Sequence, residues 1–450
     1  MKKTCFIALC IMLGVYTAFA QTAVSSAADS ETATEQNTSP AQTDSHAGQQ
    51  AQQDVPPAEK NEPAPEPKAR VLSMHSGLSI AATGAQNIFS VQDFFKPELA
   101  IDFKKLSEKT IKSGLHVGAL FNFDWFFQFT VLGEHTVKFS TTVNADVWTN
   151  ISKNVLDLIA KGNTESSTPE TITGELNAKI NAFADTGIMY QFTKPKYGFS
   201  ARVAYFIPIA YMENPEAKVT LTPKKNAASG DVEDLEVKAE ATANIYGYLP
   251  AMAAQRGLSV AELLKNGGVD LSLAGSYSPT KWVTVTGAVN YLPLKGVSMT
   301  TGLKGSFKVE GLASELRTPK GLALPETQAI TDTLPERLVR RPCKVKIGAD
   351  FRPLENDYLI LSPFLAFPVI NAKPYYIDGG LKLESHFAKV LGVYLNTEYI
   401  ERIWRHEFCF FIASRGFTFN LAASVASQDF LRTFTTLSGV GIKLGVGIGF

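Results

Sequence analysis

Histidine, serine and clustered acidic side chains are the residues from which this chain could build a catalytic or metal site. Its six histidines show no metal-ligand spacing and include His116, His135, His386 and His406. No Gly-x-Ser-x-Gly elbow occurs. The glycines around Gly441 resemble a phosphate loop, but no helix follows them. We therefore predict no enzyme, no metal site and no cofactor, with a serine–histidine pair assembled by the fold as the alternative.

The final residues alternate between apolar side chains and glycine. Because successive strand side chains point to opposite faces, we predict a strand whose apolar face runs from Val440 to Phe450. Its other face carries Gly439, Gly441, Lys443, Gly445, Gly447 and Gly449. About eleven residues rising roughly 3.3 Å each and tilted by about 45° would cross the apolar layer of a membrane. The glycine face is predicted to line a barrel lumen, where it either receives a hatch or relieves curvature at closure. A half-buried strand of a soluble sandwich is the alternative.

Comparable alternation recurs from Gly114 onward. Examples are the runs 137–147, 197–211, 235–245 and 417–425, which are longer than the strands of about 5–6 residues usual in soluble sheets. Aromatic residues fall at strand ends, as in two interfacial girdles: Tyr197, Tyr211, Tyr277, Tyr291, Phe351, Tyr399 and Phe450. We predict an all-β fold, a transmembrane antiparallel β-barrel of about 14–16 strands over residues 114–450, with an N-terminal hatch or plug.

The N-terminal part reads as an export signal and a linker. Residues 1–20 combine Lys2 and Lys3, an apolar core and the cleavage pattern Ala18-Phe19-Ala20. Residues 21–70 are rich in Ala, Gln, Ser, Thr, Glu and Pro and lack aromatic residues, so we predict a disordered linker. No later apolar run is long enough for a spanning helix.

Charge and cysteine content bear on two further classes of protein, nucleic-acid binders and disulfide-rich domains. The 43 basic residues balance the 43 acidic ones, which argues against a nucleic-acid partner. Beyond the signal only Cys343 and Cys409 remain, too few for a disulfide scaffold. Whether these two cysteines are bonded stays open.

Two further segments are candidates for control of passage. Residues 71–113 do not alternate cleanly and have the size of a hatch in the lumen or of a periplasmic cap. They contain the stretch Phe94, Phe95, Lys96, Pro97 and Glu98. Pro208 interrupts an apolar strand, and proline removes a ladder hydrogen bond and favours a bulge or kink. A lateral gate at Pro208 is our hypothesis, and a simple strand end or rim is the alternative.

In this layout the chain resembles the long-chain fatty acid transporter (FadL-like) family of outer-membrane barrels. Members have a signal peptide, an N-terminal hatch, roughly 14 strands, a kinked wall strand and a C-terminal aromatic residue. The resemblance covers residues 71–450 in layout. The family's hatch typically carries Asn-Pro-Ala after an aromatic residue, and Phe95-Lys96-Pro97-Glu98 keeps only the proline.

The resemblance implies a protein of the bacterial outer membrane that passes hydrophobic small molecules, such as long-chain fatty acids, through a plugged barrel. Its implied partners are membrane lipids, the hydrophobic ligand and the outer-membrane assembly machinery, which would recognise Phe450. One alternative is a general diffusion porin whose pore is lined by Lys138, Asp146, Arg202, Glu236 and Lys238. Another is a surface-exposed structural or adhesive barrel.

Overall fold

The computed structural model describes residues 72–86, 114–154, 172–212, 216–225, 232–248, 265–312, 334–356, 358–370, 377–388, 390–414, 416–427, 429–436 and 438–450. The chain divides into two compact units, 1–69 and 70–450, and all described residues belong to the second. The predicted signal peptide, the linker and the hatch residues 94–98 lie outside the described residues. Within the described ranges, no helix is long and apolar enough to cross a membrane.

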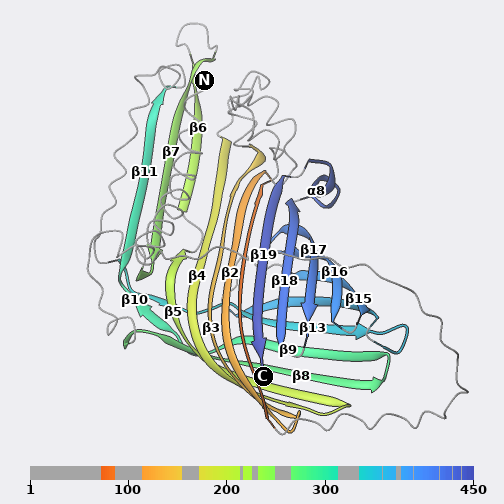
Figure 1. Ribbon diagram of the computed structural model, residues 1–450. Helices are drawn as coiled ribbons and strands as arrows, with labels where there is room; N and C mark the ends of the chain where they lie inside the picture. The colour runs from red at the N-terminus through yellow and green to blue at the C-terminus, as the bar shows by residue number, and fades with distance from the viewer. Residues whose placement is uncertain are drawn as a thin grey trace, which may run out of the picture. The chain divides into compact units, whose positions relative to one another are not determined.

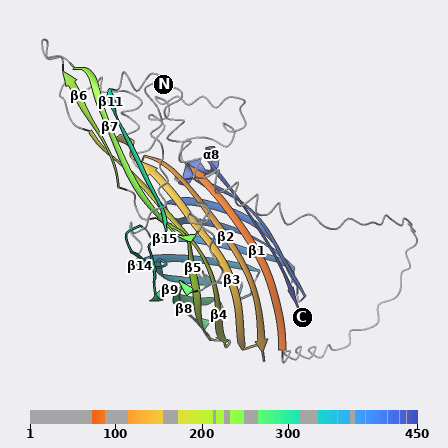
Figure 2. The same cartoon turned by 90° about the vertical axis from the view of Figure 1, so that its left-hand side faces the viewer.

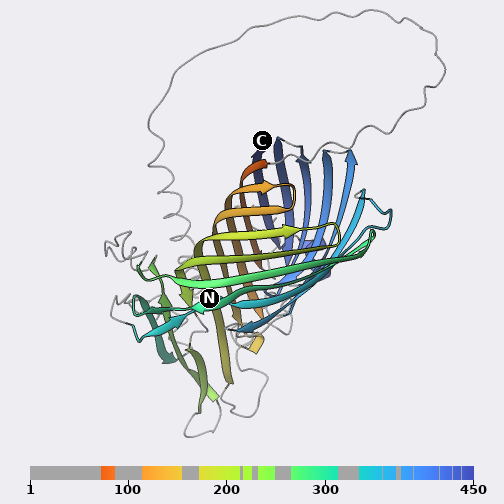
Figure 3. The same cartoon turned by 90° about the horizontal axis from the view of Figure 1, so that it is seen from below.

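Fourteen of the described strands pair edge to edge in a closed antiparallel barrel (Figures 1 and 3). In order around the ring they are β1 (Leu72–Gln86), β2 (Leu115–Val131), β3 (His135–Ile151), β4 (Ile172–Thr193), β5 (Tyr197–Met212), β8 (Gly268–Thr280), β9 (Val283–Lys295), β13 (Cys343–Phe351), β14 (Leu359–Ile370), β15 (Asp378–Ala388), β16 (Leu391–Ile400), β17 (Ile403–Ala413), β18 (Phe417–Ser427) and β19 (Gly439–Gly449). The ring closes because β1 pairs with both β2 and β19. The predicted all-β barrel of about 14–16 strands is confirmed.

The two faces of the wall differ as strand alternation requires. In β19 the outer face is apolar and exposed: Ile442 is 62% exposed, and Phe450, directly after the strand, is 74% exposed. The glycines and Lys443 of β19 turn to the inner face. The outer surface of the other strands carries the same kind of exposed apolar side chains, among them Leu78, Trp125, Phe199 and Leu421. The charged side chains gather on the inner face.

Short and long connections segregate to opposite rims. The turns 132–134, 194–196, 281–282 and 414–416 lie at one rim, together with Leu72 and Phe450. The strand ends Ile151, Met212, Lys295 and Ser427, after which the longer connections begin, lie at the other rim. The exception at this long-loop rim is the tight turn Glu401–Arg402 between β16 and β17.

The structure corrects the barrel boundary and the first part of the predicted hatch, whose residues 87–113 lie outside the described residues. Leu72–Gln86 is a wall strand, in continuous register with β2 on one side and β19 on the other. The barrel therefore begins at Leu72 rather than at Gly114. The physical reason is that β1 supplies the hydrogen-bonding partner that β19 needs for closure, and small residues such as Ser73 and Ala81 obscure its alternation.

Three further strands form a side sheet beyond the long-loop rim (Figure 2). β6 (Glu216–Lys225) and β11 (Gly302–Leu312) flank β7 (Val232–Tyr246), and β6 also pairs with the first residues of β4. Glu236 and Lys238 lie in β7 and so outside the ring, which corrects their assignment to a pore lining. β10 (Val297–Met299) pairs with β12 (Arg337–Val339). The helix α8 (Phe430–Thr436) precedes β19.

Buried residues also revise two details of the wall. Tyr211 and Tyr291 were predicted for the girdles, but Tyr211 packs in a buried cluster with Phe183 and Phe206, and Tyr291 lies under the guanidinium of Arg341. Cys343 and Cys409 are both buried free thiols.

Candidate functional site

The inner face near the long-loop rim concentrates charged side chains, and one contact there crosses the lumen. Lys179 stands on β4, and Glu401 follows β16, which lies half-way around the ring from β4. The Nζ atom of Lys179 donates to Oε2 of Glu401 over 3.3 Å. A direct ion pair thus bridges opposite walls of the ring at this level.

The same pair belongs to a longer ionic network. Lys179 also contacts Oδ2 of Asp146 on β3 at 3.3 Å. Lys344 on β13 donates to Oε1 of Glu401 at 2.9 Å and to Oδ2 of Asp378 at 2.6 Å. The backbone N–H of Glu401 donates to Oδ1 of Asp378 at 3.1 Å. Glu401 is thus held from β4, β13 and β15 at once.

The turn that carries Glu401 is built to point inward. Glu401 and Arg402 have φ values of +48° and +66°, as the two central residues of a type I′ hairpin turn require. Neither residue is glycine, so the turn stores strain that its contacts must offset. Arg402 lies over the ring of Trp148 at 5.9 Å. A methyl group added at Gly118 on β2 would lie 2.7 Å from Cδ1 of Ile403, so the Ile403 side chain packs directly over this glycine.

A second network surrounds Arg341, which ends the long connection between β9 and β13. Arg341 is 3% exposed. Its guanidinium contacts Oδ2 of Asp270 on β8 at 2.6 Å and pairs with Asp185 on β4. Asp185 also pairs with Arg202 on β5. The ring of Tyr291 lies 3.9 Å from the guanidinium carbon, so an aromatic face covers this cation.

The charges of the constriction are paired rather than free. Burial raises the pKa of the Glu401 carboxyl, but Lys179 and Lys344 outweigh it and hold that pKa below its usual range. Glu401 is therefore an anion at neutral pH, and its two lysine partners compensate its desolvation.

Little room is left between the two networks. A cavity of about 150 Å³ remains, lined by Asn144, Asp146, Asn181, Phe183, Tyr291, Arg341, Pro342, Lys344 and Glu401. This is below the roughly 300–1,000 Å³ of ordinary small-molecule sites. The constriction has to move before a ligand of that size can pass.

The glycine face of β19 is covered by its neighbours in the wall. A methyl group added at Gly441 would meet the hydroxyls of Thr83 and Ser424. One added at Gly447 would lie 2.8 Å from Nε2 of His75. Lys443 points inward and donates to the hydroxyl of Tyr394 at 3.4 Å. Side chains of β1 and β18 thus occupy the space above Gly441 and Gly447, and the Asn420 side chain of β18 occupies that above Gly445. Above Gly439 lie backbone atoms of Gly84, Ala85 and Ala426.

Pro208 is fully buried and lies at a bulge of β5. It pairs with Phe183, and the register of β4 and β5 shifts between Ala182 and Phe183. The ladder between β5 and β8 ends at Phe206, just before the proline. Phe183 and Phe206 belong to a buried apolar cluster that also contains Val339, from the connection before β13. The structure therefore shows the kink, filled by core side chains.

Sequence reasoning missed Glu401, Lys179 and Arg341. The only local signal was the charged pair Glu401–Arg402 between two apolar strands, since Lys179 and Glu401 are 222 positions apart. Asp146 and Arg202, which the sequence did assign to the lumen, both take part in the networks. No group of metal ligands occurs among the residues described.

The chain belongs to the DUF5723 family, a family of unknown function, which it matches over residues 63–339. No curated protein matches it in sequence. Among solved structures it is similar to the toluene transporter TodX of Pseudomonas putida, with 8% identity, a TM-score of 0.39, and coverage of 84% of this chain and 89% of TodX. For the toluene transporter TbuX of Ralstonia pickettii, the identity is 9% and the TM-score 0.39, with coverage of 84% of this chain and 88% of TbuX. For a FadL homologue of Pseudomonas aeruginosa, the identity is 8% and the TM-score 0.39, with coverage of 85% of this chain and 90% of the homologue.

Proposed function

We propose that this DUF5723 protein is a bacterial outer-membrane barrel that passes hydrophobic small molecules, such as long-chain fatty acids, through a lumen closed at rest by the Glu401 turn. The observation that carries this proposal is the ion pair between Glu401 and Lys179 across the lumen. Residues 87–113 of the predicted hatch lie outside the described residues, and the closing element that we propose is the Glu401 turn.

The outer face supports a membrane location. A soluble protein rarely exposes contiguous apolar patches beyond a few hundred Å², whereas this wall exposes apolar side chains on strand after strand. Aromatic side chains crowd the short-turn rim of that face, as in an interfacial girdle: Tyr190, Tyr197, Tyr277, Trp282, Phe351, Tyr358, Phe417 and Phe450.

The inner face supports a ligand with an apolar body. Lys138 lies 4.2 Å from the centroid of the Phe126 ring, and Lys346 lies 4.1 Å from that of Phe364. These lysines form no ion pair with another residue that the structure describes. Aromatic rings covered by cations offer an apolar surface and a positive charge together, which suits an amphipathic molecule better than a neutral sugar.

The test is uptake of labelled oleate into liposomes that contain the refolded mature chain. We expect uptake above that of empty liposomes. The turn variant Glu401→Asn with Arg402→Gly should take up oleate faster, because Asn-Gly is the favoured type I′ pair and removes the cross-lumen contact without breaking the hairpin. Uptake equal to that of empty liposomes for both proteins would refute the transport proposal.

A general diffusion porin is the second candidate, favoured by the charged inner residues Asp146 and Arg202. In the structure both charges are paired within the constriction. A porin would give steady open-channel currents in a planar bilayer, whereas a closed transporter gives a silent membrane.

A further inference from the structure

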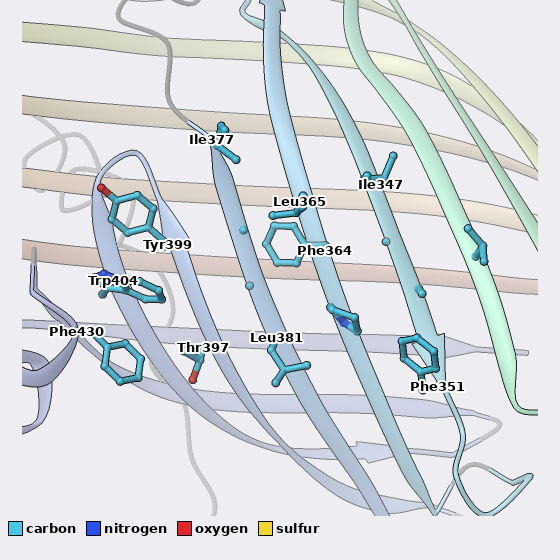
Figure 4. Close-up of a pocket in the computed structure, with 16 residues that line it drawn as sticks. Ile347, Phe351, Phe364, Leu365, Ile377, Leu381, Thr397, Tyr399, Trp404 and Phe430 are labelled. Carbon is cyan, nitrogen blue, oxygen red and sulfur yellow. The ribbon is translucent and has the colours of Figure 1, made fainter.

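A groove of about 820 Å³ lies on the outer wall of the barrel, between β13 and α8 (Figure 4). It is lined almost entirely by apolar side chains, including Ile347, Leu365, Tyr399, Trp404 and Phe430. Its volume is within the roughly 300–1,000 Å³ of small-molecule sites. The constriction contributes no residue to it.

A glycine lies at the centre of the groove. One row of cross-strand partners runs over β13, β14, β15, β16 and the start of β17: Ile347, Leu365, Gly379, Tyr399 and Trp404. All of them except Gly379 are large, so the row of apolar side chains is interrupted at its centre. A methyl group at Gly379 would lie 3.0 Å from Cδ2 of Leu365, which shows that the neighbouring side chain leans over the gap.

The helix α8 forms one side of the groove. Asp429 caps it, accepting a hydrogen bond from the N–H of Leu431 at 2.9 Å. Phe430 packs edge-on against Trp404 with ring centroids 5.0 Å apart. Leu431 is 72% exposed and Phe434 is also exposed, so the helix presents apolar side chains outward at the rim. Apolar side chains exposed in this way suit contact with the apolar layer of a membrane.

Two of the polar side chains beside the groove, Thr397 and His406, bond to each other, and the lining is mostly apolar. Thr397 and His406 share a hydrogen bond of 3.0 Å between Oγ1 and Nδ1. His406 is 4% exposed and lies under the ring of Phe434, at 4.2 Å between centroids. A peptide in the groove would lack partners for its N–H and C=O groups. A hydrocarbon chain needs none.

We propose that this groove binds one acyl chain of a membrane phospholipid and retains it more tightly than the lipid around it. The groove is continuous with the apolar wall that faces the membrane, so lipid reaches it without crossing a polar surface. Tyr399 and Trp404 place amphipathic rings at the long-loop rim, where the glycerol end of the lipid would lie. This site rests on the proposed membrane location but not on the passage of a ligand through the lumen.

The experiment measures retained lipid. The full chain is refolded into vesicles of palmitoyl-oleoyl phosphatidylcholine, extracted in mild detergent and analysed by native mass spectrometry. We expect one phospholipid per barrel. Gly379→Leu fills the notch and should lower retention about tenfold, the effect of losing roughly two buried methylene contacts. Gly275→Leu is the control, because Gly275 on the outer face of β8 has only a carbonyl oxygen near an added methyl group, at 3.8 Å.

Several results would overturn the proposal. One is equal retention by the wild-type and Gly379→Leu proteins, and another is an equal loss in Gly275→Leu. Displacement of the phospholipid by oleate at low concentration would assign the groove to the transported ligand instead. A folded Gly379→Leu barrel is verified by its heat-dependent mobility on denaturing gels.

Discussion

The carboxylate of Glu401 and the ammonium of Lys179 meet at 3.3 Å although their strands stand on opposite sides of the barrel. A wall of 14 strands is wide enough to leave an open lumen, so this contact exists only because the β16–β17 turn folds inward. The strained φ values of Glu401 and Arg402 fit that role. The closing element that we propose is therefore a hairpin tip belonging to the wall itself.

Removal of Lys179 should destabilise the barrel. Lys179→Gln leaves the carboxylates of Glu401 and Asp146 buried with less compensation, and breaking a buried ion pair costs about 3–5 kcal/mol. The matched control is Lys194→Gln, since Lys194 pairs with Glu134 at the short-turn rim at 2.5 Å with both side chains over a third exposed. That change should cost less than about 1 kcal/mol. Urea unfolding in vesicles measures both, and equal costs would contradict a buried cross-lumen pair.

Acid should weaken the closure through Glu401. Its neighbours are Lys179, Lys344, Asp146 and Asp378. The pKa of its carboxyl is held low in the folded barrel, so its contribution is complete above the ordinary glutamate value of about 4.3. It is lost as the pH falls through the lower folded value. Ion currents in planar bilayers should therefore appear only at acidic pH, and Glu401→Gln should show them at neutral pH. Wild-type and Glu401→Gln proteins that both stay without ion currents at low pH would refute closure through the Glu401 carboxylate.

Barrel closure should depend on Gly439. A methyl group there would lie 2.7 Å from Cα of Ala85 and 2.8 Å from the carbonyl oxygen of Ala426, both backbone atoms that cannot turn away. Gly439→Ala should cost about 1–3 kcal/mol through overpacking and lower the folded fraction on refolding. Gly84→Ala is the control, because an added methyl group at Gly84 meets nothing within 4 Å. Equal refolding yields would show that β1 and β19 pack less closely than described.

Both thiols should be protected in the folded barrel. Cys343 and Cys409 are buried and unbonded. A water-soluble maleimide should therefore modify neither cysteine in the folded chain and both after unfolding, as read by mass spectrometry. Rapid labelling of folded Cys409 would mean that water reaches the wall behind Tyr394.

The architecture could be predicted from the sequence because alternation is a local property. The apolar face from Val440 to Phe450 and the long strands after Gly114 predicted the barrel without any knowledge of pairing. Residues 72–86 were assigned wrongly because serine, alanine and glycine weaken their alternation. Their place as a wall strand follows only from the partner strands β2 and β19.

The constriction could not be predicted in the same way. Lys179, Arg341 and Glu401 acquire their partners from strands that are distant in the chain, and single charges carry no periodic signal. The proline rule did predict a bulge at Pro208, but the apolar side chains that fill it come from several segments. Assignment of a gate at Pro208 stays a prediction.

Planar-bilayer recording of the wild-type barrel and of the Glu401→Asn, Arg402→Gly variant tests the central claim most directly. The wild-type protein should leave the membrane silent at neutral pH, because the Glu401 turn closes the lumen. The variant keeps a favourable hairpin turn and should give steady single-channel currents. Steady currents from the wild-type protein, or a variant as silent as the wild type, would contradict closure by Glu401.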